Sequence, residues 1–450
     1  MGDPLVLAHG LGGRSDLPLN AVAAITGGGA AVLASFLVLT VAWRRPRLRP
    51  DGGRALPVRA ARVLDSPALT AAGRAVTVTL TVLVVVVALA GPPDERRNLA
   101  PWALYVTFWV GLVPASVLLG PVWARFNPLR ALHAGLCRLT RTDPRGRARL
   151  GGSVGSSVGL WPAAVGLAGF VWLELVAPGR ADPRLVGALI CGYAAVMVGL
   201  AWWFGRGWFA CGDAFEVYSA LLARMCPLGR RPDGALAWRT PLAGLAHPPG
   251  EHGERGERGE PGLAAVACVL IGSTGFDGIT RTTYWRDLAD PSSVPAGTAG
   301  LAASIAVVAA LYTGAMRLSA RLTGQDAAAL PGRFAATLLP IALGYTLAHY
   351  FSFWLLEGQM TVILASDPFG RGWDLLGSAG NRVDYGLVGP ALVAQVQVNA
   401  IVLGHIAATI AAHDLALRTG PPTRAGLGQA PVAVVMVALT CAGLFALLSG

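Results

Sequence analysis

The sequence predicts an all-α polytopic membrane protein, a bundle of about ten transmembrane helices with both the N-terminus and the C-terminus outside. Three observations lead to this fold class: the composition, the apolar runs and the placement of arginine. Hydrophobic residues make up 54% of the 450 residues and charged residues only 14%, whereas a typical soluble domain has about 25% charged residues. This composition excludes an ordinary cytosolic enzyme, a disordered chain and a nucleic-acid-binding module.

Ten apolar segments are candidates to cross the membrane, because about 20 residues of helix span the hydrocarbon core. They cover residues 21–43, 75–91, 101–123, 157–178, 185–205, 263–278, 296–316, 334–357, 390–412 and 430–449. The second and sixth are short, so we expect them to tilt little or to begin earlier. We interpret residues 1–450 as a single transmembrane domain.

The arginines predict the orientation. All 36 basic residues are arginine, and 27 of them lie in alternate loops, whereas the other set of loops and the N-terminus hold 9. The arginine-rich loops are 44–74, 124–150, 206–262, 317–333 and 413–429. By the positive-inside rule these loops are cytoplasmic. The net charge of +11 is therefore a topology signal, and we expect no nucleic-acid partner.

Two residue types restrict the chemistry further. The chain has no lysine, which excludes Schiff-base chemistry and a P-loop lysine. Its six cysteines form no CxxC pair, and we interpret them as small buried hydrophobic residues. Residues 1–20 lack a compact basic region and a cleavage site, so we expect the first span to be retained rather than cleaved as a signal peptide.

Two loops stand out. The cytoplasmic loop 206–262 begins with a predicted amphipathic helix over 208–225 and ends in a Gly/Glu/Arg-rich stretch, 250–262, which we interpret as a flexible linker. The extracytoplasmic loop 365–389 mixes Asp, Arg, Gly and Trp. That mixture suits an ordered cap over the outer end of the bundle.

Polar side chains concentrate on the outward half of the predicted spans. Because a polar group in hydrocarbon is costly, each one needs a partner or a function. The candidates are Glu174 in the fourth span, Asp277 in the sixth, His349, Glu357 and Gln359 in or just after the eighth, and Gln395 and Asn399 in the ninth.

Helical spacing predicts which of these side chains can meet. Tyr345 and His349 are one turn apart and share a face, and Glu357 continues that face if the helix runs past it. Gln395 and Asn399 in the ninth span are also one turn apart and share a polar face. His405, deeper in the same span, is turned away from that face.

Three interpretations of the outer cluster remain open. In a catalytic site, a histidine with nearby carboxylates acts as general base or holds a divalent metal ion, with His9, His349 and Asp277 as candidate ligands. In a transporter or metal-handling permease, the acids and amides line a substrate or proton path. In a structural membrane protein, they form hydrogen bonds between helices. The spacing matches no specific catalytic motif.

Several motifs together resemble one known family. They are His9-Gly-Leu-Gly-Gly-Arg-Ser-Asp-Leu-Pro18, Phe126-Asn-Pro-Leu-Arg130, Gly272-Ser-Thr-Gly-Phe-Asp-Gly278, Ala348-His-Tyr-Phe-Ser352 and Ser366-Asp-Pro-Phe-Gly-Arg-Gly-Trp-Asp374. Over nearly its whole length the chain resembles actinobacterial integral membrane proteins commonly labelled fenitrothion hydrolase.

The resemblance implies a multi-pass protein of the bacterial plasma membrane that hydrolyses an organophosphorus triester. Such chemistry needs an activated water and a group that polarises the phosphoryl oxygen. We expect the bilayer and an unidentified small-molecule substrate as partners. The candidate catalytic residues are His349, Glu357, Asp277 and Glu174, and the candidate substrate-binding residues are Arg281, Gln359 and Asn399.

Overall fold

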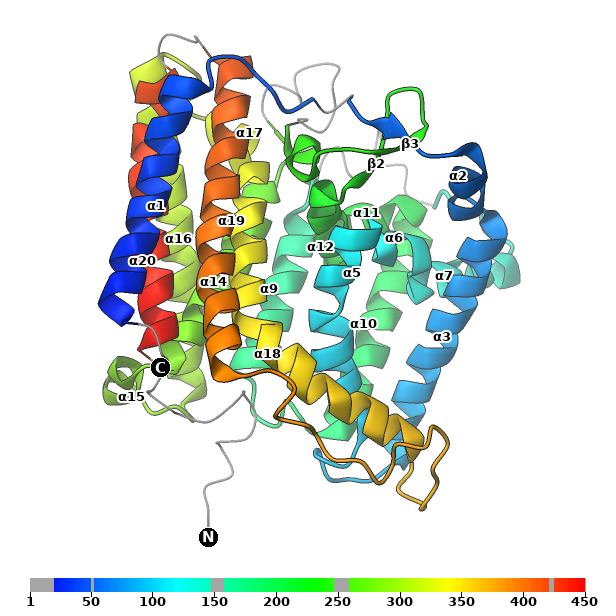
Figure 1. The fold of residues 1–450 in the computed structure, drawn as a ribbon. Helices are drawn as coiled ribbons and strands as arrows, with labels where there is room; N and C mark the ends of the chain where they lie inside the picture. The colour runs from blue at the N-terminus through cyan, green and yellow to red at the C-terminus, as the bar shows by residue number, and fades with distance from the viewer. Residues whose placement is uncertain (1–19, 50–51, 147–157, 247–258, 421–424, 450) are drawn as a thin grey trace. The chain divides into compact units, whose positions relative to one another are not determined.

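A computed structural model describes residues 20–49, 52–146, 158–246, 259–420 and 425–449 (Figure 1). Within these residues, nine helical segments are long and apolar enough to cross a membrane, and Trp161–Leu175 is a shorter apolar helix. Together they match the ten predicted spans, so the all-α transmembrane bundle is confirmed. The predicted linker at 250–262 lies largely outside the described residues, and His9 lies outside them entirely.

The chain divides into two compact units that the apolar spans do not reveal. Unit 1 comprises residues 1–50, 242–353 and 386–450, and unit 2 comprises residues 51–241 and 354–385. Helix α18 contributes its first half to unit 1 and its second half to unit 2. Each unit is described separately below.

Unit 1 is built from long helices. These are α1 (Ala21–Ala42), α14 (Leu263–Thr280), α15 (Thr283–Leu288), α16 (Val294–Thr323), α17 (Leu330–Phe334), the first part of α18 (Leu339–Ser366), α19 (Pro390–Thr419) and α20 (Ala425–Leu448). Helix α20 packs against α1, α16 and α19, and α14 packs against α16.

Small residues allow the helices of unit 1 to approach closely. A Cβ atom on Gly272 of α14 would lie 2.6 Å from Ile305 Cα of α16, and one on Gly404 of α19 would lie 2.7 Å from the Pro340 carbonyl oxygen of α18. Close backbone approach at small residues is typical of membrane helices, where van der Waals packing replaces the hydrophobic effect between helices.

Unit 2 combines long helices with shorter ones. Its elements are β1 (Arg54–Ala55), α2 (Val58–Leu64), α3 (Pro67–Ala90), α4 (Leu99–Pro101), the π-helical segment Trp102–Val110, α5 (Leu112–Leu119), α6 (Val122–Phe126), α7 (Pro128–Thr140), α9 (Trp161–Leu175), α10 (Pro183–Phe204), α11 (Phe209–Gly212), α12 (Ala214–Leu222), β2 (Leu228–Arg230) and β3 (Leu236–Trp238). Short 3-10 turns, Arg206–Trp208, Ala223–Met225 and Pro241–Leu245, connect some of them. In unit 1, the 3-10 turn Ala335–Leu338 precedes α18.

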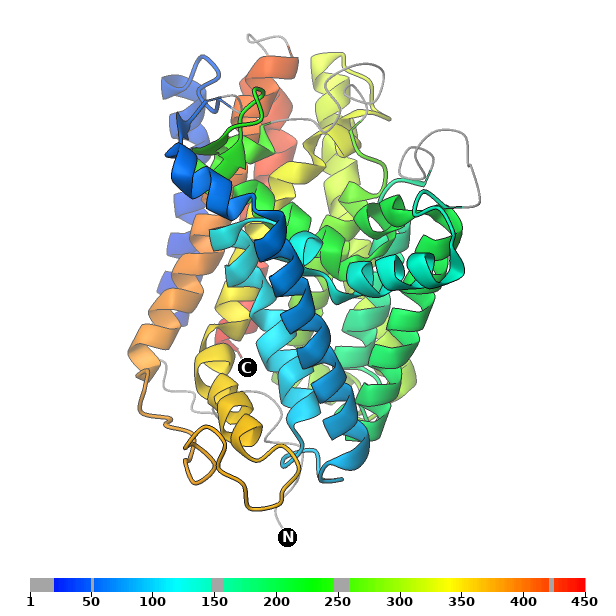
Figure 2. The same ribbon diagram turned by 90° about the vertical axis from the view of Figure 1, so that its right-hand side faces the viewer.

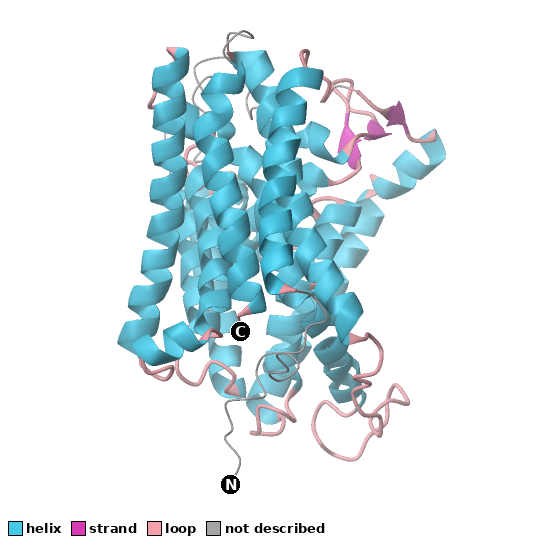
Figure 3. Ribbon diagram, turned by 60° about the vertical axis from the view of Figure 1, so that its left-hand side comes forward, coloured by secondary structure: helices cyan, strands magenta, loops and turns pink. Residues whose placement is uncertain are grey.

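The strands form one small antiparallel sheet in the order β1-β3-β2 (Figure 3). Arg54 of β1 pairs with Trp238 on one edge of β3, and Leu228 of β2 pairs with Trp238 on the other edge. This sheet folds residues of the predicted cytoplasmic loop 206–262 back onto the segment before α2.

Side-chain caps followed by proline begin several helices. Ser66 precedes Pro67 at the start of α3, Asn127 precedes Pro128 at α7, and Asp182 precedes Pro183 at α10; each side chain accepts a backbone N–H of the first turn. The cap satisfies a donor that the helix leaves unpaired, and proline fits the first turn because it lacks an N–H.

Two segments differ from their predicted extent. The amphipathic helix expected over 208–225 is broken at Asp213, whose side chain caps α12 and accepts the backbone N–H groups of Phe215 and Glu216. Helix α12 is buried along almost its whole length, so it is an internal helix of unit 2. Helix α18 continues to Ser366 rather than ending near residue 357, which places Glu357 and Gln359 inside the helix.

Candidate functional site

Three residues that the sequence analysis selected meet at one end of unit 1. Asp277 and Arg281 lie one turn apart at the end of α14, and His349 lies on α18. Nε2 of His349 is ion-paired with Oδ2 of Asp277 and lies 2.8 Å from Nη2 of Arg281, which is 3.8 Å from the same carboxylate oxygen. We call Asp277, Arg281 and His349 the outer triad.

The outer triad lies at the end of unit 1 that holds the end of the chain. The ring of Tyr284 in α15 lies 5.9 Å from that of Phe445 in α20, and Figure 1 shows α15 beside the end of α20. Small residues in the motif around Asp277 allow α14 to pack closely against two helices. Gly278 faces Ala446 of α20, and Gly272 faces α16.

Burial makes the charge balance of the outer triad important. The side chains of Asp277 and His349 are 6% and 8% exposed, whereas that of Arg281 is 38% exposed. One carboxylate therefore faces one fixed cation and one imidazole. An uncompensated charge at such a depth is strongly unfavourable, so the acid and the two bases depend on one another.

Two neighbouring groups compete for Nε2 of the His349 imidazole. Nε2 of His349 faces both the Asp277 carboxylate and the Arg281 guanidinium. The carboxylate accepts from a protonated Nε2, whereas the guanidinium donates to an unprotonated Nε2, so the tautomer of the ring decides which contact is a hydrogen bond. The ring packs against Tyr350 at 4.9 Å between ring centroids, with the two ring planes at 82°.

The other predicted site residues in unit 2 are held by local contacts. Glu357 accepts a hydrogen bond from the Tyr385 hydroxyl at 3.2 Å. The Gln359 amide donates to the Asp384 carbonyl oxygen at 3.2 Å and accepts the Asp384 N–H at 3.0 Å. These bonds tie α18 to the loop that follows it. Glu174 is buried in α9.

Residues 367–389 form the loop between α18 and α19 (Figure 2). Side chains of its first part hold it together by hydrogen bonds. Asp367 accepts the N–H groups of Arg371 and Gly372, and Asp374 accepts the Ser366 hydroxyl and the Ala379 N–H. These bonds, with the N–H of Ala379 as the largest influence, hold the pKa of Asp374 below its usual range.

Asn399 does not contribute to the outer triad. Its side chain, like that of Gln395 one turn earlier, is exposed on α19. His405 on the same helix is fully buried. Its Nδ1 is hydrogen-bonded to the Ile401 carbonyl oxygen at 2.9 Å, and within the described residues its Nε2 has no hydrogen-bond partner.

The outer triad does not suit a divalent metal ion. A metal site usually takes three or more donors from His, Cys, Asp or Glu, and no such group occurs among the described residues. Of the three predicted ligands, Asp277 and His349 lie within the described residues and His9 lies outside them. The Arg281 guanidinium lies against the nitrogen of His349 that would bind the metal. Its positive charge would repel a cation at that position.

A second buried polar cluster, which the sequence analysis missed, lies in unit 2. The Asn127 amide donates to Asp213 Oδ2 at 2.7 Å and to Glu216 Oε2 at 3.0 Å, and Glu216 forms a two-nitrogen ion pair with Arg130. The Tyr193 hydroxyl donates to Asp213 Oδ1 at 2.8 Å. The sequence signal was the spacing of Asp213 and Glu216, which is that of a capping box.

Burial raises the pKa of Asp213, which lies outside the membrane-spanning segments, to about 6. The nearby charge of Glu216 contributes to the increase, and the hydrogen bonds from Tyr193 and Asn127 oppose it. The cluster joins α7, α10 and α12. Because every side-chain oxygen in it already has a hydrogen-bond partner, no oxygen is left to bind a ligand.

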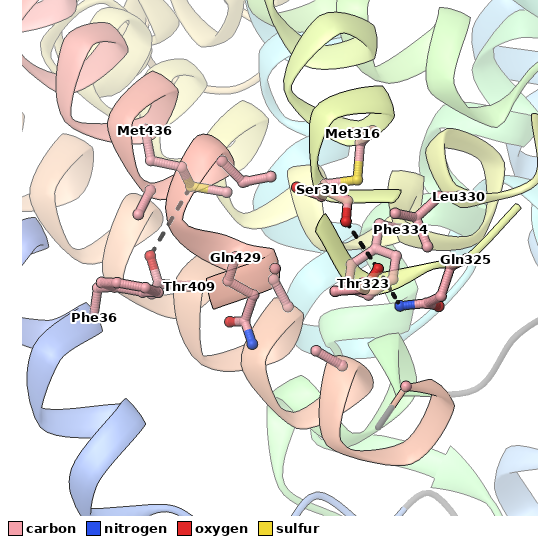
Figure 4. A pocket seen from close by; sticks show the side chains of 16 residues that line it. Phe36, Met316, Ser319, Thr323, Gln325, Leu330, Phe334, Thr409, Gln429 and Met436 are labelled. Atoms are coloured by element: carbon pink, nitrogen blue, oxygen red, sulfur yellow. Dashed lines mark hydrogen bonds between the residues drawn. The ribbon is translucent and has the colours of Figure 1, made fainter. Parts of the chain in front are cut away.

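Unit 1 also contains a small cavity between the predicted cytoplasmic ends of α16, α19 and α20 (Figure 4). Its volume is ≈ 40 Å³. Apolar side chains form most of the wall, and Ser319, Thr323, Gln325, Thr409 and Gln429 supply polar groups.

Comparisons with protein-family models, with curated proteins and with solved structures give no match. The class of the protein therefore follows from its own helices. Among the residues that the structure describes, nine apolar segments of membrane-spanning length and a tenth, shorter one define a multi-pass integral membrane protein.

Proposed function

We propose that the protein is an outward-facing hydrolase of the bacterial plasma membrane that acts on organophosphorus triesters, with the outer triad as its acid–base centre. The contact of Asp277 and Arg281 with His349 supports this proposal most directly. The resemblance to proteins labelled fenitrothion hydrolase supplies the substrate class.

In the proposed reaction, His349 is the general base. Its Nδ1 takes a proton from a water molecule, and the water oxygen attacks phosphorus while the bond from phosphorus to the leaving-group oxygen breaks. Asp277, bonded to Nε2, stabilises the imidazolium that forms. The proton on Nδ1 is then released to the departing oxyanion or to solvent, which restores the neutral ring.

Arg281 is the proposed electrophilic group. Its partly exposed guanidinium can bind the phosphoryl oxygen, on which negative charge develops during the attack. When Arg281 turns toward that oxygen, the Asp277 carboxylate is left to His349 alone. Substrate binding would thereby strengthen the base at the moment that the base is needed.

Hydrolysis of a para-nitrophenyl dialkyl phosphate by the purified protein in detergent tests this proposal. The His349→Ala variant should lose hydrolysis to the level of buffer, because the general base is absent. Gln395→Ala, which removes an exposed polar side chain of α19, is the matched control and should hydrolyse at the wild-type rate. Wild-type hydrolysis that persists in His349→Ala would contradict the site.

A transporter or metal-handling permease is the second candidate function. The cavity at the inner ends of α16, α19 and α20 favours it, because a transport path requires space on both sides of a central site. Uptake of a labelled phosphotriester into proteoliposomes without hydrolysis would favour this candidate over the hydrolase.

A further inference from the structure

The cavity of unit 1 contains polar atoms that the described chain does not satisfy. Ser319 is buried, and its Oγ atom has no hydrogen-bond partner within the described residues; the same is true of Oε1 of Gln325. Both residues line the cavity. Buried polar atoms in native proteins are nearly always hydrogen-bonded to protein or to ordered water, so these two atoms point to a bound molecule.

The size and charge of the cavity restrict that molecule. A water molecule needs roughly 10–15 Å³ of cavity volume, and the cavity measures ≈ 40 Å³. Among the described residues that line it, none is charged. The site therefore suits two or three water molecules, one of which can accept from Ser319 Oγ and donate to Gln325 Oε1, and its described wall holds no counter-ion for a resident ion.

The cavity extends inward from the cytoplasmic ends of the helices. Gln325 follows the end of α16, Gly420 follows the end of α19, and Gly428 lies in the first turn of α20. From Gly428 the lining continues along α20 to Met436, a distance of roughly 12 Å at 1.5 Å per residue. This is more than a third of a hydrocarbon core of about 30 Å.

Polar groups continue beside the cavity along α19. Thr409 lines it, and the hydroxyl of Thr409 donates to the His405 carbonyl oxygen at 2.8 Å. At the inner end, Gln429 lines the cavity and its Oε1 lies 3.2 Å from Nδ1 of His413. The other ring nitrogen of His413 faces the Trp43 carbonyl oxygen at 2.8 Å.

We propose that this cavity is an aqueous half-channel, which holds water and opens to the cytoplasmic side of unit 1. Its deep end lies at Thr409. Going further from the cytoplasmic end of α19, the next titratable residue is His405, one helical turn away. The half-channel brings water into the cytoplasmic half of unit 1. The outer triad lies at the opposite end of the same unit. The proposal does not depend on hydrolysis, so either can fail without the other.

The reactivity of Ser319→Cys toward a small, charged, membrane-impermeant methanethiosulfonate tests the half-channel. The reagent attacks a thiolate, which forms in water and not in a dry apolar core. Native Cys268, which is buried in α14 and does not line the cavity, is the internal control. Peptide mass spectrometry measures both cysteines in the same protein.

In inside-out vesicles, Ser319→Cys should react at least about tenfold faster than Cys268, and in right-side-out vesicles no faster than Cys268. Thr409→Cys, on the opposite wall, should behave in the same way and replaces Ser319→Cys if that variant does not fold. Cysteines at both positions that react no faster than Cys268 from the inner side would overturn the proposal, as would faster reaction from the outer side.

Discussion

At the scale of single residues, the carboxylate of Asp277 has the most demanding position. It compensates Arg281 and orients His349 at a depth where its side chain is almost fully buried. Removal of either member of a buried charged pair leaves the other without its partner. Each removal therefore lowers the stability by disrupting the same interaction.

We therefore expect Asp277→Asn and His349→Ala to be coupled in stability. Each single variant should lower the free energy of unfolding, and the double variant should lose less than the sum by roughly 0.5–3 kcal/mol, as contacting residues do. Reversible unfolding in detergent measures the cycle. Strictly additive losses would show that the two side chains do not interact.

The raised pKa of Asp213 predicts a pH dependence of stability. Because the folded state favours the protonated acid, the contribution to stability is complete below the ordinary pKa of 3.8 and is lost as pH rises through about 6. The loss amounts to at most ~3 kcal/mol.

Thermal unfolding between pH 4 and pH 7 should show this loss in the wild-type protein. Asp213→Asn retains the helix cap but cannot titrate, so its unfolding temperature should fall less over the same range. Parallel curves for the two proteins would be inconsistent with a raised pKa at Asp213.

Sequence reasoning reached the members of the outer triad because intramembrane polar residues are rare in this chain and helical spacing is regular. It could not show that Glu357 and Gln359 bond to the following loop, since those contacts depend on loop conformation. It also missed the partners of Asp213, because Asn127 and Tyr193 approach it from other helices.

At the scale of helices and strands, hydropathy located the spans but not all of their ends. Apolar composition predicts which residues lie in hydrocarbon, whereas a helix continues until a cap, a glycine or a proline ends it. Helix α16 thus runs to Thr323 and ends at Gly324, which adopts a left-handed conformation with φ of 73°, beyond the predicted end at 316.

The crossing of α18 and α19 depends on Gly404. Its missing side chain leaves room for the Pro340 carbonyl oxygen, 2.7 Å from where a Cβ would lie. Gly404→Ala should lower the free energy of unfolding by about 1–3 kcal/mol through overpacking.

Gly314→Ala in α16 is the matched control, because nothing lies within 4 Å of its Cβ position, and it should stay within about 1 kcal/mol of wild type. Unfolding in detergent compares the two variants. Equal stability for both would show that the close approach at Gly404 does not matter.

At the scale of the whole molecule, the arginine distribution predicts which loops face the cytoplasm. Asp233 lies exposed in the turn between β2 and β3, within an arginine-rich loop, and Asp290 lies exposed between α15 and α16, within an arginine-poor one. The positive-inside rule places them on opposite sides of the membrane.

Labelling with a membrane-impermeant maleimide checks this topology. In intact cells Asp290→Cys should be labelled and Asp233→Cys should not, and lysis should expose the second. The wild-type protein measures the background from native cysteines. The reverse pattern would invert the orientation and place the outer triad on the cytoplasmic side.

The central claim is that Asp277, Arg281 and His349 act as one acid–base centre. Phosphotriester hydrolysis by His349→Ala, Asp277→Asn, Arg281→Gln and the triple variant, in lipid nanodiscs, tests it most directly. We predict that His349→Ala loses nearly as much activity as the triple variant, because groups that act as a unit are not additive. Full activity in His349→Ala, or losses that multiply independently across the three positions, would contradict the account.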